Sequence, residues 1–158
     1  MITVNLGEIP EEGLRLSGET QQDIFDLPET ERDALPAGPV SYDLYLSEAG
    51  SGLILAQGRL KAPFRLRCVA CLEEFPFTLQ WNDYVAEFEI PAAGQLDLTE
   101  RIREDLLLEL PAYPHCDRDN DAPDHVCPAA GKFGASGPLP GSGPSAWDAL
   151  DGFSSSSD

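Results

Sequence analysis

The sequence predicts an α+β fold: an antiparallel, open barrel-like sheet followed by one main helix and a disordered tail. Apolar and polar residues alternate through much of the first 90 residues, which is the period of half-buried strands. Apolar residues recur at four-residue intervals over about 97–110, which indicates a helix. Gly, Ser and Pro dominate from residue 131 onward, a composition that buries too little apolar surface to fold. We therefore expect one domain over 1–130 and a tail over 131–158.

The predicted strands succeed one another with turns between them. Alternation favours strands at Ile2–Leu6, Leu14–Leu16, Val40–Leu46, Leu53–Leu60, Phe75–Leu79 and Tyr84–Ile90. Residues 49–52, Ala-Gly-Ser-Gly, are a turn signal that predicts a hairpin between the strands on either side. The acidic, proline-containing stretch 21–39 predicts a loop or a short helix.

The helix has a start signal and a stop signal. Asp97 and Glu100 have the spacing of a capping box, with aspartate in place of the usual Ser or Thr. Pro111 ends the helix, since proline cannot continue it. The chain then runs directly into Pro114-His115-Cys116.

The tail contains one apolar element, at 147–153. Trp147, Leu150 and Phe153 are large apolar residues among polar ones, a pattern typical of a short docking peptide. A tail whose tryptophan packs back on its own domain explains the pattern equally well.

Composition excludes several classes of function. With 28 acidic and 10 basic residues the formal net charge is −18, which disfavours a purely electrostatic grip on nucleic acid. There is no signal-peptide pattern at the N-terminus and no apolar run of membrane-spanning length, so we expect a cytoplasmic protein with reduced thiols. No nucleophile–base pair and no phosphate-binding glycine loop stands out, so we expect neither catalysis nor a small-molecule substrate.

The four cysteines form one close pair and one loose pair. Cys68 and Cys71 are a CxxC, whereas Cys116 and Cys127 are separated by ten residues. Four thiolates complete the tetrahedral shell of a structural Zn²⁺, and His115 or His125 could replace a sulfur. Redox chemistry is disfavoured, because the CxxC lies between strand-like segments and two glutamates follow it. Cysteines that bind nothing remain open as an alternative.

Four of the ten basic residues are Arg59, Lys61, Arg65 and Arg67. On an extended strand these odd-numbered residues share one face, and Leu60, Ala62, Phe64 and Leu66 share the other. This basic stripe leads into the CxxC and suits contacts with RNA phosphates. The alternative is an ordinary solvated sheet face, and Pro63 interrupts the strand.

Two segments carry a family resemblance. The stretch 66–75, LRCVACLEEF, resembles the central motif of the YceD-like family, the large ribosomal RNA subunit accumulation proteins. The helix ending EDLLLELP at 104–111, which leads into Pro114-His115-Cys116, is similar to the segment that follows in that family. The order of elements also agrees, and Trp147–Leu150 resembles a short apolar element near the family's C-terminus.

The resemblance implies a bacterial, non-enzymatic factor in large ribosomal subunit assembly that supports accumulation of 23S rRNA. Its partners would be precursor rRNA, a basic ribosomal protein, or both. Many members end a fuller cysteine cluster in Cys-Pro-x-Cys-Gly, whereas this chain has Ala130 at the second cysteine position. The alternative function is a zinc-stabilised protein-binding module without RNA contact.

Overall fold

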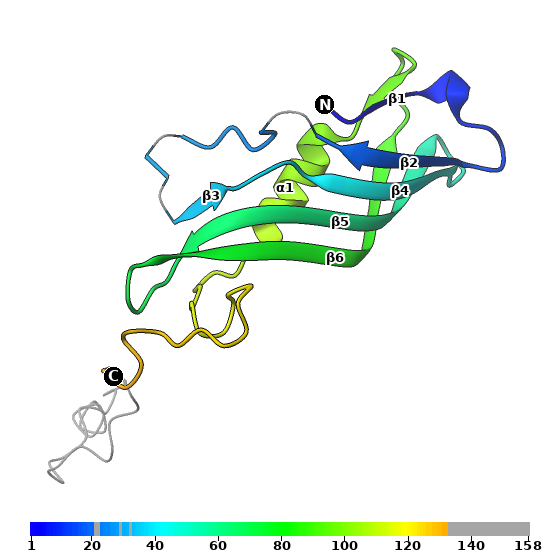
Figure 1. The fold of residues 1–158 in the computed structure, drawn as a ribbon. Helices are drawn as coiled ribbons and strands as arrows, with labels where there is room; N and C mark the ends of the chain where they lie inside the picture. Colours follow the sequence, from blue (N-terminus) through cyan, green and yellow to red (C-terminus); the bar gives the residue numbers. More distant parts are fainter. Residues whose placement is uncertain (21–22, 29, 32, 133–158) are drawn as a thin grey trace, which may run out of the picture. The chain divides into compact units, whose positions relative to one another are not determined.

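In a computed structural model, which describes residues 1–20, 23–28, 30–31 and 33–132, a curved antiparallel sheet forms a half-barrel (Figure 1). Its strands are β2 (Leu14–Glu19), β3 (Ala34–Pro36), β4 (Ser41–Glu48), β5 (Leu53–Arg67) and β6 (Glu74–Glu89). β2 pairs with β4, and β4 with β5, while β6 pairs along the other edge of β5. β3 continues the β4 edge at the far end of β5. The predicted β-rich antiparallel sheet with one main helix is confirmed.

One helix, α1 (Thr99–Glu109), lies across one face of this sheet (Figure 1). Even-numbered β5 residues from Ile54 to Leu66 are buried except Gly58, and the buried Ile102 and Leu106 of α1 contribute to the same core. The prediction of a helix over about 97–110 is therefore correct. Among the described residues, no helix is long and apolar enough to cross a membrane.

A second, two-stranded sheet joins the N-terminus to the start of α1. It pairs β1 (Thr3–Asn5) with β7 (Gln95–Asp97). A short 3-10 helix, η1 (Leu6–Glu8), follows β1. The predicted capping box was wrong, because the N-cap of α1 is Leu98 and has no side-chain cap. Asp97 Oδ1 still accepts the Thr99 N–H at 2.8 Å, whereas the Glu100 carboxylate pairs with Arg103. The Ile2 N–H also donates to Thr99 Oγ1, which anchors the N-terminus to the helix.

Two strand predictions were wrong in extent. Residues 21–39, predicted as a loop or short helix, include β3, which adds three residues to the sheet. Residues 75–79 and 84–90, predicted as separate strands, belong to one strand, β6. A β-bulge explains this difference, because Asn82 and Asp83 both lie opposite Arg59. The extra residue shifts the inward-facing positions from odd to even numbers, so the sequence resembles two strands.

Gly58 lies next to Arg59, the residue opposite this bulge, at a point where β4 and β5 approach closely. A Cβ atom at Gly58 would lie 2.9 Å from Leu44 Cα and closer still to the Asp43 carbonyl oxygen. The backbone φ of +155° also disfavours a side chain. Pro63 is accommodated differently: it lies between the β4 and β3 pairings, and its carbonyl accepts the Ala37 N–H.

Residues 1–128 form one compact unit, and residues 129–158 are assigned to a second unit. In the second unit, Lys132 N–H donates to the Ala129 carbonyl in a turn. Residues 133–158, with the predicted disordered tail and the apolar element of Trp147, Leu150 and Phe153, lie outside the described residues.

Tyr84 connects β6 to α1 and supports a prediction. Its buried hydroxyl donates to Asp105 Oδ2 at 2.8 Å, and burial together with that carboxylate raises the pKa of Tyr84. We expect Tyr84→Phe to lower the free energy of unfolding by about 1 kcal/mol, as measured by urea denaturation at neutral pH.

The stability should also depend on pH through Tyr84. The unfolded tyrosine ionises near pH 10, which is below the pKa of Tyr84 in the folded protein. Wild-type stability should therefore fall above about pH 10, and Tyr84→Phe should lack this component; an equal fall would contradict it.

Candidate metal centre

The tip of the β5–β6 hairpin positions the first two cysteines. β5 ends at Arg67 and β6 begins at Glu74, so Cys68 and Cys71 lie in the connecting turn. The turn is closed by the Cys68 N–H donating to the Glu73 carbonyl and by the Leu72 N–H donating to the Cys68 carbonyl, each at 2.9 Å. Leu72 adopts a positive φ of 64° to complete it. The CxxC thus lies in a turn between two strands and not at the start of a helix.

The segment after α1 supplies the other two cysteines. Val69 N–H donates to the Pro114 carbonyl at 2.9 Å, which fixes this segment against the hairpin tip. Cys68 Sγ then lies 3.9 Å from Cys127 Sγ, and Cys71 Sγ lies 3.7 Å from Cys116 Sγ. All four sulfurs lie within 4.8 Å of one another, and only Cys71 is not fully buried.

These separations fit a tetrahedral metal site. With Zn–S bonds near 2.3 Å, the sulfurs of a tetrahedral shell are about 3.8 Å apart. A disulfide needs about 2.0 Å, so the four thiols are free. A cluster of four sulfurs, three of them buried, is the donor set of a structural zinc ion. The predicted cysteine set therefore comes together as one cluster compatible with a metal ion such as Zn²⁺.

The surroundings of the cluster favour ionisation of one cysteine thiol and disfavour ionisation of another. Burial opposes ionisation of the Cys68 thiol, but the backbone N–H groups of Cys71, Cys116 and Ala70 outweigh it and lower its pKa to about 6. Burial and the adjacent thiols raise the pKa of Cys116. Several thiolates so close together repel one another, and a bound dication removes that repulsion.

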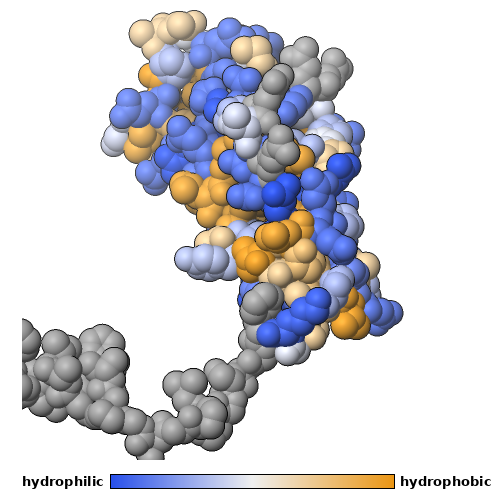
Figure 2. All heavy atoms as spheres, turned by 90° about the vertical axis from the view of Figure 1, so that its left-hand side faces the viewer, coloured by the Kyte–Doolittle hydropathy of each residue, from blue (hydrophilic) through white to orange (hydrophobic). Residues whose placement is uncertain are grey.

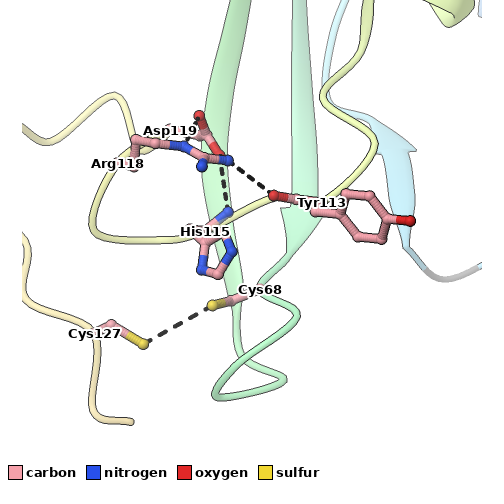
Figure 3. Close-up of polar contacts among 6 residues, drawn as sticks. All are labelled: Cys68, Tyr113, His115, Arg118, Asp119 and Cys127. Atoms are coloured by element: carbon pink, nitrogen blue, oxygen red, sulfur yellow. Dashed lines mark hydrogen bonds and ion pairs between the residues drawn. The ribbon is translucent and has the colours of Figure 1, made fainter. Parts of the chain in front are cut away.

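A network of hydrogen bonds braces the loop that carries Cys116 (Figure 3). Asp119 Oδ2 accepts the His115 N–H at 2.8 Å, and Arg118 donates both to Asp119 and to the Tyr113 carbonyl. The Arg118 guanidinium lowers the pKa of Asp119, so this brace stays charged. The acidic loop 117–124 is therefore partly structural, a role that its sequence does not reveal. Asp121 likewise accepts hydrogen bonds from the Thr78 N–H and hydroxyl.

The predicted histidine substitutes lie outside this ligand set. The potential metal-binding group found in the described chain contains four sulfurs and no imidazole nitrogen. Sulfur ligands suffice for the shell, so neither His115 nor His125 is needed. His125 Nε2 is nevertheless buried without a hydrogen-bond partner among the described residues.

No protein-family model, curated protein or solved structure matches this chain. The interpretation of the site therefore depends on its own geometry.

The basic stripe lies on the predicted face of β5, away from α1. Arg59, Lys61 and Arg65 are exposed and Arg67 is half-buried, while the four intervening apolar residues alternate with them as expected, although Pro63 lies within the strand. Carboxylates pair with part of the stripe: Arg59 contacts Asp43 at 2.7 Å and Arg65 contacts Glu74 at 3.4 Å. Within the described chain, Lys61 has no carboxylate at ion-pair distance.

Sequence reasoning missed Arg15. This β2 residue binds Asp43 through two hydrogen bonds of 2.8 Å, from Nε to Oδ1 and from Nη2 to Oδ2. Asp43 therefore joins Arg15 and Arg59 across three strands. The signal was present in the outward position of Arg15, but the pairing of β2 with β4 could not be read from the sequence.

Proposed function

We propose that this protein is a non-enzymatic, cytoplasmic factor in large ribosomal subunit assembly that supports the accumulation and processing of 23S rRNA. One observation carries the proposal: the two segments that resemble the YceD-like family meet at the four-cysteine cluster. The CxxC turn supplies Cys68 and Cys71, and the segment after α1 supplies Cys116. Motifs 45 residues apart in the sequence thus form a single structural feature.

In this proposal Cys68, Cys71, Cys116 and Cys127 hold one structural Zn²⁺. The ion would neutralise the thiolates and fix the segment after α1 to the hairpin tip. Its role is mechanical, because four sulfurs leave no open position for substrate or water.

The exposed cations of β5 are the proposed contact with rRNA phosphates. Phosphate contacts position a protein on RNA without reading its sequence, which suits a stripe of arginine and lysine. The remaining surface of a chain with net charge −18 would repel RNA and attract a basic ribosomal protein. The stripe can therefore orient the protein as well as bind.

Sedimentation tests this function. We expect the tagged protein in a native lysate to migrate with particles that contain precursor large-subunit rRNA. Changing Arg59, Lys61 and Arg65 to glutamate should return it to the top of the gradient, because charge reversal repels phosphate. Arg103→Gln on α1 is the control, and thermal unfolding checks the fold. Retention of wild-type protein at the top of the gradient, even at low salt, would contradict the proposal.

A second function, a zinc-stabilised protein-binding module without RNA contact, is favoured by apolar exposure near the cluster. The residues Val69 and Leu72 at the hairpin tip are 45% and 68% exposed. Figure 2 faces this end of the sheet and shows apolar residues among polar ones. The tail element 147–153 would be a further docking segment. Particle association that survives the glutamate changes but is lost on truncation after Gly131 would favour this function.

A further inference from the structure

A hollow of about 290 Å³ lies beside the CxxC turn at the hairpin tip. Two polar residues, Asp33 and Arg67, and four apolar residues contribute to its lining: Val69, Leu72, Ala112 and Pro114. The hydrogen bond from the Val69 N–H to the Pro114 carbonyl holds two of its walls together. Because Val69 and Leu72 are exposed, this apolar surface is open to a ligand.

Arg67 is the only cation in this lining, and its charge is not balanced within the described chain. No carboxylate of the described residues lies at ion-pair distance from Arg67, since its cross-strand neighbour Glu74 pairs with Arg65 instead, at 3.4 Å. Arg67 Nε is buried and donates no hydrogen bond to any described residue. Buried nitrogens in proteins usually have a partner, so Arg67 has donors and charge available for a ligand.

The lining favours a ligand that carries a carboxylate next to an apolar group. The two terminal nitrogens of Arg67 are not buried, and such a pair donates two parallel hydrogen bonds to one carboxylate. The volume is near the lower limit of ligand pockets, about 300 Å³, which suits a single residue. An apolar residue at the C-terminus of a chain supplies both groups, because its carboxylate and its side chain are attached to the same Cα.

The acids around the hollow define the rest of the ligand. Asp33 contributes to the lining and Glu73 is exposed at the hairpin tip, in a chain of net charge −18. These acids repel an acidic or neutral peptide that ends in a carboxylate, and they attract a peptide with basic residues before its last one. The ligand is therefore the end of a basic chain.

We propose that this hollow binds the C-terminus of a basic protein, with the terminal carboxylate on Arg67 and an apolar last side chain against Val69 and Leu72. This inference rests on the proposed function, because the partner is the basic ribosomal protein named there, and it adds the site of contact. It also separates Arg67 from the exposed cations of β5, which remain the contact with RNA.

Two forms of one peptide test the site on the unmodified full-length protein. A short labelled peptide of lysine and serine ends in leucine, either with a free carboxylate or as the amide, and anisotropy at low salt measures its binding. We expect the carboxylate form to bind roughly ten- to a hundredfold more tightly, since hydrogen bonds between charged groups are the strong ones. Non-specific attraction would favour the amide, which has one more positive net charge.

Variants locate the contact. Arg67→Gln should weaken binding of the carboxylate form by roughly tenfold and remove its advantage over the amide. Leu72→Ser should weaken both forms by roughly three- to tenfold, because both bury the leucine side chain. Asp33→Asn should strengthen binding of the carboxylate form, since it removes a repelling charge. Arg59→Gln is the matched control, because Arg59 belongs to the same stripe but lies outside the hollow.

Several results would overturn this inference. Equal binding of the two peptide forms to wild-type protein would do so without any variant having to fold. An advantage of the carboxylate form that survives Arg67→Gln, or weaker binding after Asp33→Asn, would do so as well, with thermal unfolding as the check on each variant. Particle migration of a wild-type protein that does not bind the peptide would refute this inference alone. Peptide binding without particle migration would refute only the assembly function.

Discussion

Removal of the proposed Zn²⁺ from the four-cysteine cluster is expected to lower the free energy of unfolding by about 5 kcal/mol or more, since binding to a structural site contributes directly to folding. Without the ion, the β5–β6 hairpin and the segment after α1 remain connected by hydrogen bonds, from Val69 to Pro114 and between Asp121 and residues Pro76 and Thr78. Elemental analysis of protein purified without chelator should find about one Zn²⁺ per chain. Thermal unfolding with and without a strong chelator would measure the loss.

Single substitutions should separate ligands from neighbours. Cys68→Ser and Cys116→Ser are expected to lose the metal and to melt like the chelated protein, because each removes one of four sulfurs. His125→Ala is the matched control and should retain the ion, since the ligand group of the described chain contains no histidine. A wild-type protein that is metal-free and melts identically with chelator would show that the cysteines bind no structural metal.

Gly58→Ala is expected to lower the free energy of unfolding by about 3 kcal/mol, the upper range for forcing a methyl group into a packed site. The added carbon would meet the Asp43 carbonyl and Leu44 Cα, both of which are backbone atoms that no rotamer change can move. Chemical denaturation measures the loss.

Gly7→Ala provides the comparison for Gly58→Ala. No heavy atom lies within 4 Å of a Cβ at Gly7, so that variant should differ from wild type by less than about 0.5 kcal/mol. Equal stability of the two variants would mean that β4 and β5 are further apart at Gly58 than described.

The parts of the fold with a long, uninterrupted pattern could be predicted from sequence. Alternation predicted β5 and the face that carries its basic stripe, because the inward-facing residues from Ile54 to Leu66 are all even-numbered. β6 was predicted as two strands because its inward-facing residues change from odd to even numbers at the bulge of Asn82 and Asp83. β3 and β7 were missed because neither lies in a run of more than two alternating apolar residues, whereas β1 lies within the alternation of Ile2, Val4 and Leu6.

The sequence predicted which cysteines form the candidate site, but not the contacts that position them. Only four cysteines exist, and the CxxC spacing indicated a shared ion. The irregular ten-residue gap between Cys116 and Cys127 is spanned by turns that Asp119 and Asp121 hold in place. The Asp121 contact with Thr78 joins residues of different elements, and the link between Arg15 and Asp43 likewise depends on strand order. Sequence spacing alone contains neither.

The position of Cys127 determines the order in which the cluster can be assembled during synthesis. A chain that emerges N-terminus first presents the two thiols of the hairpin tip long before Cys127, which lies 59 residues after Cys68. The hairpin and α1 can therefore dock while the site has only two or three of its sulfurs. Full coordination of the proposed ion then becomes the last step of folding, so a bound ion would mark a chain that has already completed its sheet.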